Sequence, residues 1–113
     1  MQKDIPEVSK IIIPILTRFK VGARNVYGQN LKKVILYGSY AKGLATPNSD
    51  IDLMIVLSEM ESAFVEIDRL NEIKFNLGLE YEVYISTNPV TEYNFSHSKL
   101  PIFKNIARDG IEI

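Results

Sequence analysis

Two short apolar runs, residues 34–37 and 53–57, lie at the ends of the segments 31–37 and 51–57, which we expect to be strands. Both are rich in Val, Ile and Leu, the composition that favours β-strands. The second segment is apolar at almost every position, so we expect a central strand that is buried on both faces of a sheet. Between the runs, residues 39–45 predict a loop or one helical turn, and residues 46–49 (Thr-Pro-Asn-Ser) predict a tight turn.

The segment before the first run has helical periodicity. Apolar side chains recur at spacings of three and four over residues 8–19 and predict a helix that packs against one face of the sheet. Asp4 is expected to cap its start, with Pro6 in the first turn. Pro14 should kink the helix or divide it in two, and the helix should end within residues 22–28.

After the second run, Ser58 is expected to cap a helix from about residue 59 to 76, and Gly78 is a plausible stop. Residues 79–85, Leu-Glu-Tyr-Glu-Val-Tyr-Ile, alternate between apolar and polar positions and predict a third strand. The rest of the chain predicts a polar, turn-rich stretch, a short helix and a small edge strand, over residues 86–101, 102–108 and 111–113.

These elements predict a single α/β (α+β) domain over residues 1–113, with a small mixed sheet, helices packed on one face and a polar site on the other. The chain has a net charge of −1, without the basic excess that is typical of nucleic-acid-binding modules. It has no cysteine, which excludes disulfides and thiolate metal sites and is compatible with the cytoplasmic location that we expect. The apolar runs are too short to span a bilayer, and the N-terminus lacks the apolar stretch of a signal peptide.

The candidate chemistry lies between the two apolar runs. Gly38 and Ser39 follow the first run directly, and Asp50 and Asp52 precede the second. Carboxylates two residues apart on a strand point to one face, roughly 6–7 Å apart along the chain. Two acids beside an anion-binding turn indicate a divalent cation, and Mg²⁺ would make this a site for a nucleoside triphosphate.

The turn offers the candidate phosphate contacts. Gly38 allows a close approach of the backbone to phosphate, and Ser39 can donate its hydroxyl and its backbone N–H. A short helix that starts there would add further free N–H groups. Lys42 could neutralise phosphate charge, and Ser49 is the fourth residue of the expected nucleotide-binding set.

The string Gly-Ser-Tyr-Ala-Lys-Gly at 38–43, followed by Ser-Asp-Ile-Asp-Leu at 49–53, resembles the signature of the DNA polymerase β-like nucleotidyltransferases. It is similar in particular to the minimal nucleotidyltransferases, small proteins often encoded beside a HEPN-domain toxin as its antitoxin. The resemblance implies the polymerase β-like fold, a two-ion Mg²⁺ site held by Asp50 and Asp52, and ATP as substrate. It also implies a third catalytic and metal-binding carboxylate on the neighbouring strand, for which position favours Glu82, with Glu80 as the alternative.

The resulting hypothesis is an enzyme that transfers AMP from Mg-ATP to a hydroxyl. The resemblance implies that the acceptor is a tyrosine of a cognate HEPN toxin and that the protein acts as an antitoxin. The alternative is an antitoxin with little or no activity, which neutralises its partner by binding alone. An antibiotic adenylyltransferase is disfavoured, because the short chain leaves no room for a domain that holds a small-molecule acceptor. We expect neither a membrane nor a nucleic acid as partner, and both homo- and hetero-oligomers remain open.

Overall fold

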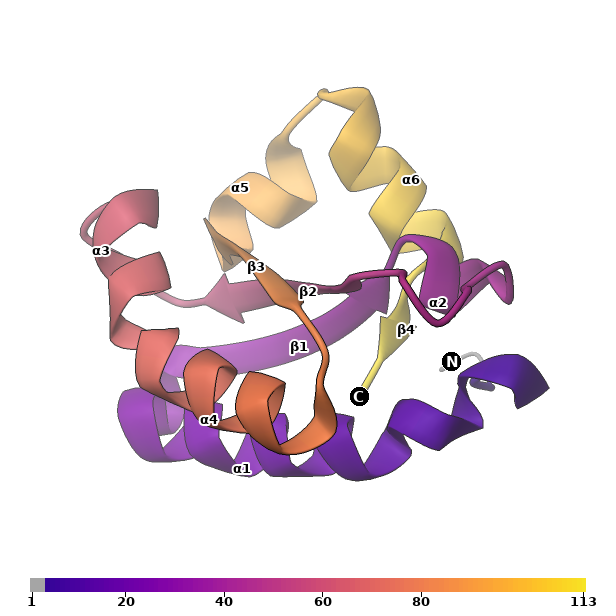
Figure 1. Ribbon diagram of the computed structural model, residues 1–113. Coiled ribbons are helices and arrows are strands. Elements are labelled where there is room, and N and C mark those ends of the chain that lie inside the picture. Colours follow the sequence, from indigo (N-terminus) through magenta and orange to yellow (C-terminus); the bar gives the residue numbers. More distant parts are fainter. Residues whose placement is uncertain (1–3) are drawn as a thin grey trace.

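A four-stranded mixed sheet forms the centre of the computed structural model, which describes residues 4–113 (Figure 1). The strand order is β3-β2-β1-β4. Strands β1 (Leu31–Tyr37) and β2 (Ile51–Leu57) are antiparallel, β3 (Ile85–Thr91) is parallel to β2, and β4 (Ile111–Glu112) is antiparallel to β1. The two strands predicted at 31–37 and 51–57 and the small edge strand after residue 110 are confirmed.

Helices cover both faces of this sheet (Figure 1). On one face lie α1 (Ile13–Tyr27), preceded by the 3-10 helix η1 (Glu7–Ile12), and α4 (Asn71–Tyr81). On the other lie α5 and α6. The mixed α/β class predicted from the sequence is confirmed, and α5 and α6 add a second cover to the face on which the polar site was expected. The remaining bounds are η2 (Gly28–Asn30), α2 (Ser39–Lys42), α3 (Ala63–Arg69), α5 (Glu92–His97) and α6 (Pro101–Asp109).

The alternation of side chains along β2 divides the core in two. Ile51, Leu53 and Ile55 point toward α1 and α4, in the larger cluster of buried side chains. Met54 and Val56 belong to a smaller cluster on the opposite face, which includes Ile106 of α6. Asp52 is two residues before Met54, so its side chain opens toward the same face as α5 and α6.

The N-terminal helical segment divides as Pro14 predicts. The 3-10 helix ends at Ile12, and α1 begins with Pro14 in its first turn, where a missing N–H costs nothing. The predicted cap at Asp4 is wrong: η1 follows Pro6 and has no side-chain cap. Helix α1 continues through Gly22 to Tyr27. At Gly22 the absence of a side chain allows α1 and α4 to pack closely, because a Cβ there would come within 2.8 Å of Ile73 Cδ1 in α4.

The single helix predicted from residue 59 to 76 is wrong, because the chain forms two helices, α3 and α4, here. The cap is Ser62 rather than Ser58: its Oγ accepts a hydrogen bond from the N–H of Val65 at 3.2 Å. Ser58 instead donates to Oδ1 of Asn30 at 2.6 Å and ties the end of β2 to η2.

The strand predicted at residues 79–85 is also wrong over most of its length. Helix α4 runs through Gly78 and ends at Tyr81, which packs against the same core as Leu77. Gly78 does not stop the helix. A Cβ on it would come within 2.9 Å of the carbonyl oxygen of Val83, so the glycine leaves room for the chain to turn back toward the sheet.

The third strand is therefore β3, six residues later than predicted at its start, and α5 follows it directly within the stretch expected to be turn-rich. It is an edge strand that contains Pro89. The N–H of Ile51 donates a hydrogen bond to the carbonyl of Tyr84 at 2.9 Å. In this register the backbone N–H and C=O groups of every second β3 residue point away from β2, and Pro89 is at one of these positions. Among residues 4–113, no helix has the length and apolar character that a membrane crossing needs.

Candidate active site

The turn after β1 has a backbone that only glycine adopts readily. Gly38 has φ 75° and ψ −153° and precedes the first residue of α2. Helix α2 ends at Gly43, also at φ 75° and in the left-handed region. The sequence prediction of a short helical turn after the first strand is thus confirmed. It presents the first-turn N–H groups of Ser39 and its neighbours, which have no acceptor within the helix.

Gly38 is in direct contact with Asp52. Gly38 directly follows β1, whose last residue, Tyr37, is the register partner of Asp52 on β2. A Cβ added to Gly38 would come within 2.2 Å of Oδ2 of Asp52. The absent side chain of Gly38 is therefore what makes room for the carboxylate, and the predicted anion-binding turn and the predicted metal ligand share one space.

The two aspartates influence each other electrostatically. Burial raises the pKa of Asp52, and the negative charge of Asp50 raises it further. Asp50 is exposed and directly precedes β2, whereas Asp52 is half-buried within it. Repulsion between the two carboxylates is the situation that a bound divalent cation relieves.

Tyr37 and Asn88 complete the surroundings of Asp52. Burial raises the pKa of Tyr37, the negative charge of Asp52 adds to that increase, and a hydrogen bond with Asn88 opposes it. Asn88 lies on β3, two residues after Ser86, which is the register partner of Asp52. Polar uncharged side chains thus occupy the part of β3 nearest to the aspartates.

The predicted third carboxylate is not beside this pair. Glu82 follows α4 in a left-handed turn at φ 55°, exposed to solvent, and Glu80 lies on α4, where it pairs with Arg18. The placement of both on a strand facing Asp52 is wrong because residues 79–81 complete the helix. Within the described part of the chain, no group of three His, Cys, Asp or Glu side chains is arranged to hold a metal ion.

Two predicted nucleotide contacts have different surroundings. Lys42 is exposed at the end of α2 and, with Gly38 and Asn105 of α6, lines a pocket of about 300 Å³. Its position beside the Gly38 turn suits a phosphate contact. The hydroxyl of Ser49, in contrast, accepts a hydrogen bond from the N–H of Thr46 at 2.8 Å, so it closes the turn that leads to Asp50.

A supporting residue was missed by the sequence interpretation. Ser9 of η1 is fully buried, and its hydroxyl donates to the carbonyl of Tyr40 in α2 at 2.5 Å. A Cβ on Gly43 would lie 3.3 Å from Pro6, so the same N-terminal segment also packs against the end of α2. The available signal was that Ser9, Ile12 and Leu16 lie on one helical stripe, which places a hydroxyl among core side chains.

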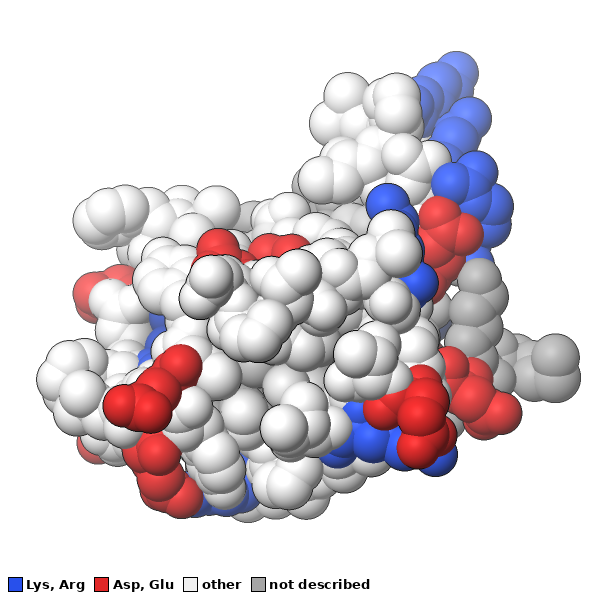
Figure 2. Space-filling view, turned by 45° about the vertical axis from the view of Figure 1, so that its right-hand side comes forward, with Lys and Arg blue, Asp and Glu red and all other residues white. Residues whose placement is uncertain are grey.

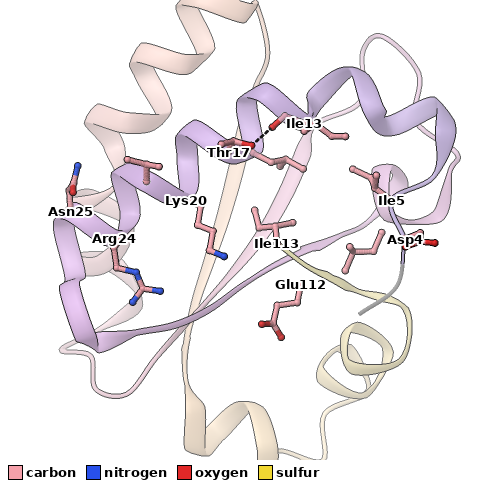
Figure 3. A pocket seen from close by; sticks show the side chains of 12 residues that line it. Asp4, Ile5, Ile13, Thr17, Lys20, Arg24, Asn25, Glu112 and Ile113 are labelled. Carbon is pink, nitrogen blue, oxygen red and sulfur yellow. Dashed lines mark hydrogen bonds between the residues drawn. The ribbon is translucent and has the colours of Figure 1, made fainter. Parts of the chain in front are cut away.

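A larger pocket, of about 640 Å³, lies elsewhere, between α1 and β4 (Figure 3). Side chains such as Ile13 and Thr17 from α1 face Ile113 at the chain's end, with Lys20 and Arg24 at one side. It is predominantly apolar and contains none of the motif residues of the turn or the aspartate pair. Its size alone therefore does not make it the site of the predicted chemistry.

The aspartate pair fits Mg²⁺ by its donor chemistry. Mg²⁺ prefers oxygen ligands and is commonly held by one or two carboxylates, with water and substrate phosphates completing the shell. Asp50 and Asp52 supply two such carboxylates beside a turn suited to phosphate. The residues described on β3 add no carboxylate to them, so the second of the two expected ions stays a prediction.

The comparisons with known proteins agree with this geometry. The profile of the nucleotidyltransferase domain family matches residues 22–108, which include the turn, the aspartate pair and β3. The chain is 35% identical over 75 residues to a Methanocaldococcus jannaschii protein inferred to be a protein adenylyltransferase, covering 66% of this chain and 75% of that protein.

Two solved structures share the fold. One is an inferred nucleotidyltransferase of Sulfolobus solfataricus, with a TM-score of 0.66 and 16% identity over 94% of this chain and 82% of that one. The other is a toxin–antitoxin crystal structure with AMP-PNP, with a TM-score of 0.59 and 15% identity over 83% of this chain and 68% of that one. Together with the family match over most of its length, the Gly-Ser turn and the paired aspartates, these likenesses show that the chain is a nucleotidyltransferase and belongs to the nucleotidyltransferase domain family.

Proposed function

We propose that this nucleotidyltransferase is a protein adenylyltransferase that moves AMP from Mg-ATP to a tyrosine hydroxyl of a HEPN-domain toxin, and so acts as an antitoxin. The observation that carries the nucleotide part is the contact between the Gly38 turn and Asp52, with Asp50 next to it. The relative from M. jannaschii, inferred to be a protein adenylyltransferase, supports a protein acceptor.

The proposed reaction forms a bond between the acceptor oxygen and the α-phosphorus of ATP. It breaks the bond from that phosphorus to the oxygen that bridges the α- and β-phosphorus. Pyrophosphate leaves with the bonding electron pair, and the hydroxyl proton passes to water or to a base of the acceptor protein. Asp50 and Asp52 would hold Mg²⁺, which would neutralise the charge of the triphosphate.

This chain's own residues align the triphosphate in the proposal. The backbone N–H groups at the start of α2 and the ammonium group of Lys42 bind phosphate oxygens, and Gly38 permits their approach. Catalysis by alignment and charge neutralisation requires little covalent help from the protein.

A second candidate function, neutralisation of the partner by binding alone, is favoured by one observation. Ser86 and Asn88 stand on β3 beside Asp52, and neither can act as a base or as a charged ligand at neutral pH. A site with two carboxylates can hold a nucleotide through Mg²⁺, but it leaves the deprotonation of the acceptor to other groups.

One experiment separates the two functions. The protein is incubated with Mg-ATP and the product of the neighbouring reading frame, and intact-mass and peptide spectrometry search for an AMP adduct, a gain of one adenylyl group. We expect the adduct on a tyrosine with the wild type and its loss in Asp50→Asn, Asp52→Asn. Toxin neutralisation that persists in the double variant, without any adduct, would establish the binding function instead.

A further inference from the structure

A groove of about 490 Å³ lies beside the loop that leads to the aspartate pair. Its walls come from three parts of the chain: Val8 and Ile11 of η1, Thr46 and Pro47 of the loop, and Glu82 in the connection from α4 to β3. Pro47 precedes Asp50 by three residues, and three residues span at most about 10 Å. The groove therefore adjoins the loop that carries Asp50, on the α1 and α4 side of the sheet, whereas the side chain of Asp52 opens toward the opposite side.

The groove exposes apolar side chains that no other part of residues 4–113 covers. Ile11 is 80% exposed and Val8 52%, although both belong to a helix whose other side, at Ser9 and Ile12, is fully buried. An isolated exposed aliphatic side chain is ordinary, but two on one wall of a groove beside the loop that leads to Asp50 indicate a contact surface.

Glu82 gives this groove a negative charge. Its backbone is in the left-handed region at φ 55°, which is strained for a residue with a side chain. The neighbouring Glu80 is bound by Arg18, whereas within residues 4–113 no lysine, arginine or histidine forms an ion pair with Glu82. A carboxylate thus stands at the mouth of an apolar groove, in a position where glycine or asparagine would be less strained.

The apolar surface continues past the groove. A second pocket, of about 630 Å³, shares Val83 with it and is lined by Phe75, Leu79 and Tyr84, each 66–67% exposed. Figure 2, in which the side with η1 comes forward, shows a broad uncharged area with both acidic and basic side chains along its lower margins. Exposed apolar side chains that extend over two adjoining pockets favour a protein contact.

We propose that this surface docks the acceptor protein of the transfer reaction, and that an apolar helix of the acceptor enters the groove with a lysine or arginine opposite Glu82. The inference rests on the proposed function and adds where and by what chemistry the acceptor is held. A second copy of this chain fits less well, because a symmetric contact around the groove would bring two Glu82 carboxylates into one apolar interface. A phosphate backbone would meet the same repulsion.

Kinetics of AMP transfer to the neighbouring gene's product test the docking surface. For Ile11→Ser and for Glu82→Lys, we expect the KM for the acceptor to rise on the order of tenfold or more, with little change in kcat and in ATP affinity by calorimetry. Lysine bears the same left-handed backbone cost as glutamate, so Glu82→Lys should keep its thermal stability. The controls are Val26→Ser, at an exposed aliphatic residue of α1, and Glu59→Lys, just beyond the far end of β2.

A cross-link provides a readout that does not depend on transfer. With p-benzoylphenylalanine at position 11, irradiation should join the two proteins, whereas the same group at position 26 should not. If the wild type modifies the neighbour but both groove variants transfer with unchanged KM, the docking surface is wrong and the proposed function stands. If the wild type gives neither adduct nor cross-link, the protein acceptor itself is wrong.

Discussion

The α-carbon of Gly38 and the carboxylate of Asp52 lie against each other across the β1–β2 pair, with no space for a side chain between them. The phosphate-binding turn and the proposed metal ligand are therefore parts of one rigid unit. A substitution at either residue should therefore alter the position of the other.

Gly38→Ala should weaken Mg-ATP binding strongly. The new methyl group would displace the Asp52 carboxylate, and alanine at φ 75° would also strain the backbone by roughly 1–2 kcal/mol. Gly28→Ala is the matched control, since Gly28 also has a positive φ, of 56°, but open space around it. Calorimetry should show a loss of ATP affinity for Gly38→Ala alone, and thermal unfolding should show a loss of stability for both. Equal ATP affinity in the two variants would contradict the shared space.

Asp52→Asn should stabilise the protein in the absence of metal. Amide and carboxylate have the same shape, but the amide removes the cost of burying charge next to Asp50. Since Asp52 is only half-buried, solvent screening limits the gain to about 1 kcal/mol or less in the free energy of unfolding. The same variant should lose the additional stabilisation that Mg-ATP gives the wild type. Thermal unfolding with and without Mg-ATP measures both effects, and the exposed Glu59→Gln serves as a control.

The affinity for Mg-ATP should fall at mild acidity. The folded-state pKa of Asp52 lies above its ordinary value, so the proton begins to compete with the metal at a higher pH than it would at an exposed aspartate. Without metal the sign is opposite: the protonated form favours folding below the ordinary pKa, and this contribution is lost as pH rises through the raised one. Calorimetric titrations with Mg-ATP at neutral and at mildly acidic pH should show the decline in affinity for the wild type. An affinity that does not change with pH would contradict the prediction.

Ser86→Asp should provide the carboxylate that β3 lacks. Residue 86 is the register partner of Asp52 and shares its face of the sheet, so a new aspartate there would join Asp50 and Asp52. Mg²⁺ affinity should increase, and stability without metal should fall because three carboxylates repel one another. Ser86→Asn keeps the size of the change without the charge and should do neither. Isothermal titration with Mg²⁺ is the direct measurement.

Ser9→Ala should destabilise the nucleotide-binding turn, although Ser9 lies in η1 and not in the turn itself. The variant leaves the Tyr40 carbonyl without its buried donor, at a cost of about 1–3 kcal/mol. Thr17→Ala removes an exposed hydroxyl bonded within α1 and should change stability by much less. Hydrogen exchange in α2 should accelerate for Ser9→Ala only, and an unchanged rate would mean that η1 does not support the turn.

The strand pair that holds the site could be predicted to the residue, because its two strands are short, rich in Val, Ile and Leu, and bounded by Gly38 and Asp50. Local chemistry and tertiary structure agree there. The segment 79–85 could not be predicted in the same way. Its residues alternate like a strand, but Tyr81 also continues the helical stripe of Leu70, Ile73 and Leu77. Tertiary packing against α1 decided for the helix.

The third carboxylate was misplaced for the same reason. Once residues 79–81 belong to α4, the neighbouring strand must be Ile85–Thr91, a segment with Asn88 and Pro89 that has little strand character by itself. Pairing with β2, which is buried at every residue except Asp52, makes it a strand. The helical stripe of Ser9, Ile12 and Leu16 indicates that Ser9 is buried, but its partner could not be predicted, because the hydrogen bond joins residues 31 positions apart.

The proline of β3 has a consequence for how this protein behaves at high concentration. An edge strand normally offers a row of free N–H and C=O groups, to which the edge of another molecule can add. Pro89 removes a donor from the middle of that row, and the opposite edge of the sheet is β4, only two residues long. Growth of the sheet from one molecule into the next is hindered at both ends, so the chain can carry exposed apolar side chains for a partner with less risk of forming fibrillar aggregates.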